Sequence, residues 1–355
     1  MAVVRDIVPV GVPFASGVAA SALFSLSGAC AHFFLAASSI MVLLLLRFRG
    51  RCGLVVYAAL FFCLGAFCGS GRGFFGAGAD DLPGFASAAL SRLETLIASV
   101  DYPHERTGAL LRALLTGQRD GLAAGTLQAF RDAGASHILA LSGLHLGLIY
   151  AIAGRLLKIL GNSRPAYILR SVLLVSLSAF YILMTGASPS IARAFIFIVF
   201  NEYARISPGR LKKPANIWCA ALMLQLAINP SVVSSAGFQL SYLAMLGIYM
   251  LYPVLDGWYP RSGKWDLLRR VWSGMALSIS CQIFTGPLAW LRFGSFPKYF
   301  LLTNLIAMPL VSVLMAVAVA CLAASAAGVC PEWLVKMTDS LAEALQGCLE
   351  TIAGM

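Results

Sequence analysis

The chain has 355 residues, of which 59 % are hydrophobic and only 12 % are charged. A soluble domain of this size has too little interior to bury that much apolar surface, so the composition excludes an ordinary soluble protein and indicates a membrane protein. The net charge of +11 is compatible with nucleic-acid binding, but cytoplasmic loops of membrane proteins collect Lys and Arg in any case.

Repeated apolar runs of about 20 residues predict an all-α, polytopic membrane protein with about ten transmembrane helices and additional amphipathic surface helices. The predicted spans, in chain order, are 9–28, 30–46, 53–70, 137–157, 166–186, 189–205, 214–229, 235–253, 271–291 and 299–325. Clusters of Lys and Arg follow the second, fourth, sixth and eighth spans. These loops share the cytoplasmic side if the N-terminus is cytoplasmic, which predicts a multi-pass protein of the inner membrane.

The chain divides by composition into four regions. They are an N-terminal three-helix membrane region (1–70), an extracytoplasmic linker with amphipathic helices (71–136), a larger transmembrane region (137–330) and a C-terminal amphipathic helix (331–355). In the second region, apolar residues such as Leu110 and Leu114 recur at helical spacing, so these helices are expected on the outer membrane surface or against the bundle. Asp120 is expected to cap one of them.

The fourth predicted span carries an unusual concentration of polar side chains: His137, Ser142 and His145. In hydrocarbon such groups persist where they contact protein or line a wet cavity. Ser142 and His145 are also spaced for a nucleophile pair on one helix face, which leaves intramembrane hydrolysis open. Gly143 and Gly147 form a small-xxx-small pattern that lets another helix approach closely. The histidine spacing and the absence of a nearby carboxylate argue against a metal site.

Further polar residues interrupt the later spans. Arg193, near the outer end of the sixth span, can either extend to water or face a wet lumen, where a guanidinium suits phosphate oxygens. Other interruptions are Gln239 and Ser241 beside Gly237 in the eighth span, Gln282, Thr285, Gly286 and Pro287 in the ninth, and Asn304 with Pro309 in the tenth. Several such positions together predict a polar pathway or broken helices beside one.

Four stretches of the sequence resemble the ComEC competence family, whose members bring transforming DNA across the inner membrane as a single strand. The stretches, in the family's order, are Leu114-Leu-Thr-Gly-Gln-Arg119 with Phe130-Arg-Asp-Ala-Gly134 and His137-Ile-Leu-Ala-Leu-Ser-Gly-Leu-His145; Ser190-Ile-Ala-Arg-Ala194; Asn229-Pro230 with Gly237-Phe-Gln-Leu-Ser241; and Asn304-Leu-Ile-Ala-Met-Pro309. The resemblance covers about 105–310 and implies a short form without the oligonucleotide-binding-fold and metallo-β-lactamase-like domains of many members.

The resemblance implies a channel for single-stranded DNA in natural transformation rather than an enzyme, with no cofactor. The residues expected to line the channel or contact DNA are His137, Ser142, His145, Arg193, Gln239, Ser241 and Asn304. The residues expected to serve helix packing are Gly143, Gly147, Gly237 and Pro309. Besides DNA and the lipid bilayer, the implied partners are a cytoplasmic helicase or motor and a separate DNA receptor or nuclease. A secondary transporter of a small solute, which would bind at broken ninth and tenth helices, remains the alternative.

Overall fold

The structure is a computed structural model that describes residues 6–24, 28–47, 53–70, 84–139, 141–161, 163–206, 213–260, 266–294 and 299–354. These residues form α-helices and short 3₁₀ turns joined by loops, and no strand occurs among them, as the all-α prediction requires. The Gly-rich stretch that begins the second predicted region, 71–83, lies outside the described residues, as do parts of the basic loops.

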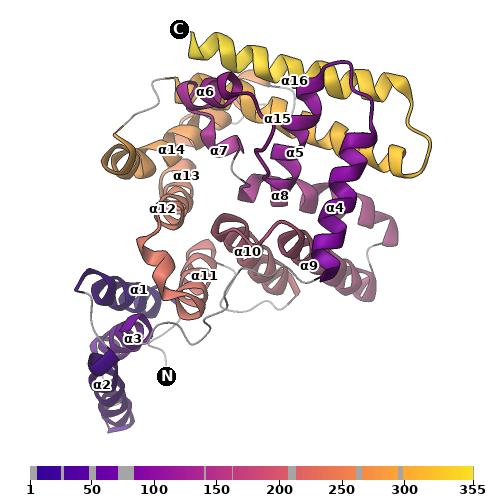
Figure 1. Ribbon diagram of the computed structural model, residues 1–355. Helices are drawn as coiled ribbons and strands as arrows, with labels where there is room; N and C mark the ends of the chain where they lie inside the picture. The colour runs from indigo at the N-terminus through magenta and orange to yellow at the C-terminus, as the bar shows by residue number, and fades with distance from the viewer. Residues whose placement is uncertain are drawn as a thin grey trace. The chain divides into compact units, whose positions relative to one another are not determined.

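The helices follow one another along the chain as shown in Figure 1. Their bounds are α1 Val8–Leu23, α2 Gly28–Arg47, α3 Gly53–Ser70, α4 Gly84–Ser99, α5 Glu105–Thr116, α6 Ala124–Asp132, α7 Ser136–Leu139, α8 Gly143–Leu156, α9 Arg164–Met184, α10 Pro189–Ile206, α11 Pro214–Ile228, α12 Ala236–Met250, α13 Tyr252–Asp256, α14 Leu267–Phe293, α15 Phe300–Ala326 and α16 Glu332–Ala353.

Four stretches of helix in the described chain are long and apolar enough to cross a membrane: Gly143–Leu160, Arg164–Met184, Leu267–Phe293 and Phe300–Ala326. Shorter apolar helices occupy most of the other predicted spans, in α1, α2, α3, α11 and α12. The sixth predicted span coincides with α10, which carries Arg193, Glu202 and Arg205 and is not among the helices that are apolar enough to cross a membrane. Multiple long apolar helices indicate a multi-pass membrane protein.

The fold contains two compact units, each built from separate parts of the chain. The first consists of residues 1–78 and 196–249, and the second of residues 79–195 and 250–355. In the first unit, α1 and α3 cross at glycines: a Cβ atom built on Gly17 would lie 2.0 Å from the carbonyl oxygen of Phe62, and one on Gly65 would lie 2.0 Å from that of Phe14. Any side chain at these positions would therefore force the two helices apart.

The second unit is organised around a helical hairpin, in which α16 runs back along α15 (Figure 1). Amphipathic helices α4, α5 and α6 pack against this hairpin and share one apolar core with it. Buried members of this core include Leu110 and Leu114 of α5, Leu314 of α15, and Leu345 and Leu349 of α16. The apolar faces of the predicted amphipathic helices are thus covered by other helices of the same chain.

The structure corrects three expectations about individual helices. The predicted fourth span, 137–157, is wrong as one helix, because α7 ends at Leu139 and α8 begins only at Gly143. The ninth and tenth spans are not broken, since α14 and α15 each run as one 27-residue helix with Pro287 and Pro309 inside. Asp120 caps no helix, because the N-cap of α6 is Ala123.

Candidate functional site

The break between α7 and α8 is stabilised by a capping box made from two predicted site residues. Ser142 is the N-cap of α8, and its Oγ accepts a hydrogen bond from the backbone N–H of Leu144 at 3.3 Å. The His145 side chain reaches back, so that its Nδ1 accepts from the backbone N–H of Ser142 at 3.0 Å. A serine just before a helical segment is a strong N-cap signal, which accounts for the helix start at Gly143.

The capping box also determines the chemistry of His145. Because Nδ1 accepts a backbone hydrogen bond, the ring proton of the neutral imidazole lies on Nε2. This Nε2 is buried and has no hydrogen-bond partner in the described residues. Ser142 Oγ lies 3.0 Å from Nδ1, but no carboxylate of the described chain lies within hydrogen-bond distance of the ring. The pair therefore has the geometry of a helix cap, without the orienting acid that a nucleophilic triad uses.

Arg193 lies near the start of α10, which meets the start of α8. We call this contact the α8–α10 junction. Arg193 is only 2 % exposed, and its Nη2 atom donates a hydrogen bond to Ser190 Oγ at 3.3 Å. The next residue, Ala194, meets α8 closely, since a Cβ built on Gly143 would lie 3.1 Å from the Ala194 Cβ. The N-terminal turns of α8 and α10 are therefore in contact, and buried Ser188 Oγ, just before α10, lacks a hydrogen-bond partner among the described residues.

The other predicted channel residues lie in different parts of the fold. His137 is in α7, and Asn304 is in α15 with a buried Oδ1 that has no partner in the part of the chain described. Thr303, beside Asn304, donates to the carbonyl oxygen of Ala133 at 2.7 Å and ties α15 to the segment before α7. These residues belong to the second unit.

Gln239 and Ser241 belong to the first unit, on α12. Gln239 Nε2 donates to the carbonyl oxygen of Val233 at 2.8 Å, which anchors the start of α12 to the preceding 3₁₀ turn. Apart from the chain neighbours and the backbone of the same helix, no atom of the described residues lies within 4 Å of a Cβ built on Gly147 or Gly237.

A polar cluster that the sequence interpretation missed joins the start of α5 to the C-terminal helix α16. Asp339 of α16, 3 % exposed, accepts hydrogen bonds from His104 N at 3.1 Å and from Thr107 Oγ1 at 2.6 Å. Its Oδ2 lies 2.7 Å from His104 Nδ1. Residues Asp339, Glu343 and Gln346 follow the spacing of one helix face, which is the only sequence signal for this cluster.

The hydrogen bonds of this cluster shift two pKa values in opposite directions. The hydrogen bond to Asp339 and its negative charge raise the pKa of His104 above the ordinary value. Burial by itself would raise the pKa of Asp339, but the hydrogen bonds from Thr107 and His104 outweigh it and lower this pKa. His104 and Asp339 therefore favour each other's charged form.

No group of three or more His, Cys, Asp or Glu side chains in the described ranges is arranged to hold a metal ion. The candidate site thus offers backbone N–H groups at two helix starts, a guanidinium, an imidazole N–H, hydroxyls and an amide oxygen. Such a set can bind and orient polar or anionic groups.

Comparison with known proteins identifies a family and several relatives that match parts of this chain. The family model described as Competence protein matches residues 114–355. ComE operon protein 3 of Bacillus subtilis (strain 168) is 30 % identical over 148 residues, which are 42 % of this chain and 18 % of that protein. Competence protein ComA of Neisseria gonorrhoeae is 31 % identical over 140 residues, or 38 % of this chain and 20 % of that protein.

A third relative is described as uncharacterized protein YcaI of Escherichia coli (strain K12). It is 26 % identical over 211 residues, which are 58 % of this chain and 27 % of that protein. The matched stretches thus cover between 18 % and 27 % of the length of these curated relatives. No solved structure matches the chain significantly.

Proposed function

Because the chain belongs to the Competence protein family, we propose that it carries single-stranded DNA across the cytoplasmic membrane during DNA uptake. One of its relatives is named Competence protein ComA, and competence is the state in which cells take up DNA. The proposal concerns the membrane step, because the matched residues 114–355 include all four of the long apolar stretches.

The observation that carries the proposal is the junction of α8 and α10. Gly143 and Ala194 bring the N-terminal turns of two helices together, and Arg193 directly precedes Ala194. Helix N-termini carry partial positive charge and unpaired backbone N–H groups, so they attract anions. A buried guanidinium beside two such ends favours a phosphodiester, which binds Arg through charge-assisted hydrogen bonds.

Transport requires that this attraction be local and weak enough to release the strand. A polyanion crosses a bilayer only along a polar route, and tight binding at one point would stall it. His145 Nε2, Ser188 Oγ and Asn304 Oδ1 are buried polar atoms without partners in the described residues, and they supply uncharged hydrogen-bonding positions for such a route. His137 is proposed as a further lining residue of this route in the second unit, with Gly143 and Pro309 as packing residues of its walls. Gln239 and Ser241, which belong to the first unit, are proposed to contact the strand there.

Directional transport also needs an energy source. We expect a cytoplasmic helicase or motor to pull the strand inward, and a separate receptor or nuclease to deliver it as a single strand. The N-terminus is expected on the cytoplasmic side, where basic residues such as Arg155 and Lys158 would meet the emerging strand.

The test is downhill entry of labelled single-stranded DNA into proteoliposomes that contain the full chain, a process that needs a conduit but no motor. Arg193→Ala should lower the uptake of a single strand by about tenfold or more, because a charge-assisted hydrogen bond contributes about 1.5–3 kcal/mol. Arg193→Lys, which keeps the charge, should retain part of the activity. The matched control is Arg170→Ala, which removes a half-buried arginine that lies 5.0 Å from the Tyr167 ring on α9.

The same variants are then compared in the native host by transformation frequency and by cytoplasmic delivery of labelled DNA. Unchanged delivery after deletion of the gene, or equal uptake by Arg193→Ala and Arg170→Ala proteins of equal stability, would contradict the proposal. Uptake of small solutes that proceeds without DNA would instead support a secondary transporter.

A further inference from the structure

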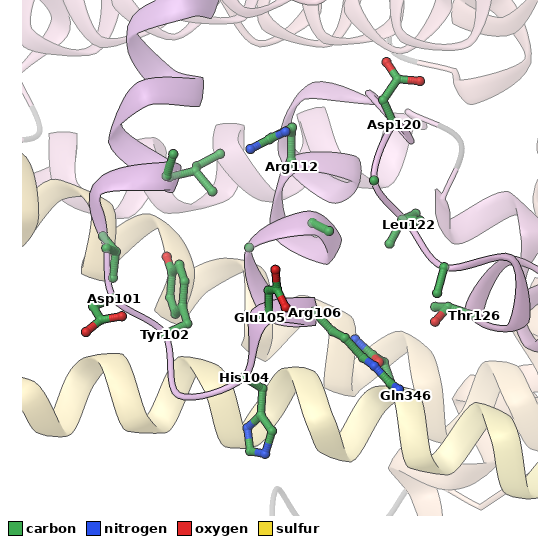
Figure 2. Close-up of a pocket in the computed structure, with 17 residues that line it drawn as sticks. Asp101, Tyr102, His104, Glu105, Arg106, Arg112, Asp120, Leu122, Thr126 and Gln346 are labelled. Carbon is green, nitrogen blue, oxygen red and sulfur yellow. The ribbon is translucent and has the colours of Figure 1, made fainter.

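The second unit contains a pocket whose lining shares no residue with the α8–α10 junction, and Figure 2 shows its lining residues. Its volume is about 470 Å³, and its walls come from α4, the loop before α5, α5 itself, the α5–α6 loop, α6 and one residue of α16. The volume falls within the range of small-molecule sites. None of the predicted channel residues lines it.

The residue from α16 is Gln346, and its side chain is 4 % exposed. Both its Nε2 and its Oε1 are buried without a hydrogen-bond partner in the described residues. A buried donor and acceptor that stay unpaired cost stability, so native proteins rarely keep them unless something else binds there. Figure 2 shows Gln346 rising from α16 among the residues that line the pocket.

Two further groups at this pocket are buried and unpaired in the described chain, namely the Tyr102 hydroxyl and the Arg112 Nε. The lining carries the carboxylates of Asp101, Glu105 and Asp120 against the guanidinium groups of Arg106 and Arg112. The remaining basic residue of the lining, His104, is paired with Asp339, so carboxylates outnumber the other basic groups. This balance disfavours a phosphate as the group bound inside the pocket. It favours a neutral ligand that can both donate and accept hydrogen bonds.

We propose that the pocket binds a single unpaired nucleobase of the DNA strand, an inference that rests on the proposed function. A carboxamide presents a donor and an acceptor side by side, which matches the hydrogen-bonding edge of a base. Tyr102 provides an aromatic ring and Arg112 a planar guanidinium, the two kinds of side chain on which unstacked bases lie. A base in double-stranded DNA is already paired and stacked, so the pocket selects single-stranded DNA.

Binding measurements on the full chain in lipid nanodiscs test the proposal. The probes are a short fluorescent single strand of mixed sequence and an abasic strand with the same number of phosphates. The strand with bases should bind the unaltered protein about tenfold more tightly than the abasic strand. Gln346→Leu should remove most of this difference while the affinity for the abasic strand stays unchanged. Gln128→Leu, which changes an exposed glutamine of the same unit, should keep the difference in affinity between the two strands.

Thermal unfolding provides the second readout. Because the amide of Gln346 has no protein partner in the described residues, Gln346→Leu should unfold at the same temperature as the unaltered chain or higher. A lower unfolding temperature would show that the amide serves the fold. If Gln346→Leu prefers the strand with bases over the abasic strand as strongly as the unaltered protein does, the pocket assignment is overturned. If the pocket assignment alone fails, uptake still depends on Arg193. If neither probe binds and uptake is absent, the proposed function fails as well.

Discussion

The Nδ1 atom of His104 lies 2.7 Å from the Oδ2 atom of Asp339, although 235 positions separate the two residues in the chain. The contact ties the loop before α5 to the C-terminal helix α16. The same carboxylate also accepts a hydrogen bond from Thr107, which is fully buried. The amphipathic helices of 84–132 and the C-terminal helix therefore form one structural layer with α15, and residues of α4, α5, α6 and α16 in this layer line the pocket around Gln346.

Removal of this carboxylate should destabilise the protein. Asp339→Ala leaves Thr107 Oγ1 and the His104 backbone N–H without their acceptor, and we expect a loss of about 2–3 kcal/mol of unfolding free energy. Chemical denaturation in detergent micelles measures the change. The control is Glu332→Ala, which removes an exposed pair with Lys336 on the same helix and should change stability much less. Equal effects of the two substitutions would contradict this role of Asp339.

Stability should depend on pH through the same pair. The raised pKa of His104 means that its contribution is complete below about pH 6.5, the ordinary histidine value, and is lost as pH rises through the raised value. The lowered pKa of Asp339 means that its contribution is complete above about pH 3.9 and is lost as pH falls through the lowered value. The unfolding temperature should therefore be highest between these limits.

The variant His104→Asn separates this effect from other titrating groups. It should flatten the decrease in unfolding temperature between about pH 6 and pH 9, relative to the unaltered chain. His32→Asn, at an exposed position of α2, serves as the control and should keep the decrease. An identical pH profile for the unaltered protein and His104→Asn would show that the pair does not control stability.

The close crossing of α1 and α3 predicts a large difference between two glycine substitutions. Gly65→Ala places a methyl group 2.0 Å from the Phe14 carbonyl oxygen, so we expect a loss of about 1–3 kcal/mol from overpacking. Gly147→Ala in α8 meets no other part of the described chain within 4 Å beyond its own helix and should gain about 0.5–1 kcal/mol from helix propensity. Thermal unfolding in detergent compares the two, and equal unfolding temperatures would be inconsistent with the crossing.

The contact between the start of α5 and α16 also has a consequence for membrane topology. Seven predicted spans separate the region 71–136 from 331–355, which would place the two regions on opposite faces of the membrane. Yet His104 and Asp339 are hydrogen-bonded within one core. We therefore expect both regions to be accessible from the same side, so that the number of segments that cross between them is even.

Cysteine labelling decides this point. In a chain with its nine cysteines replaced, single cysteines at the exposed positions Asp101 and Gly354 should react with a membrane-impermeant maleimide from one side only, and from the same side. Reaction from opposite sides would mean that the layer does not form in the membrane. Lys158→Cys, in the predicted cytoplasmic loop after α8, reports the orientation.

Part of the candidate site follows from the amino-acid sequence alone. The spacing of Ser142 and His145 predicts that the two side chains meet, and their atoms do lie 3.0 Å apart. The apolar run through residue 140 predicts one continuous helix, which is wrong because Ser142 is a strong N-cap residue and starts a new one. The position of Arg193 in the sequence leaves open whether it extends to water or faces a wet lumen, and its burial and its closeness to α8 depend on tertiary packing.

The amino-acid sequence by itself determined the helical membrane class, the positions of most helices and the family, because hydropathy, capping residues and short motifs act over neighbouring residues. Only the tertiary structure decided which helices pack together, where α8 begins its contact with α10, and which polar atoms stay buried without partners among the described residues. Such features depend on side chains that meet across long sequence separations, as His104 and Asp339 do, and no local pattern specifies those meetings. The Gln346 pocket belongs to this second class, since residues from α4, α5 and α16 form it only after the helices have packed.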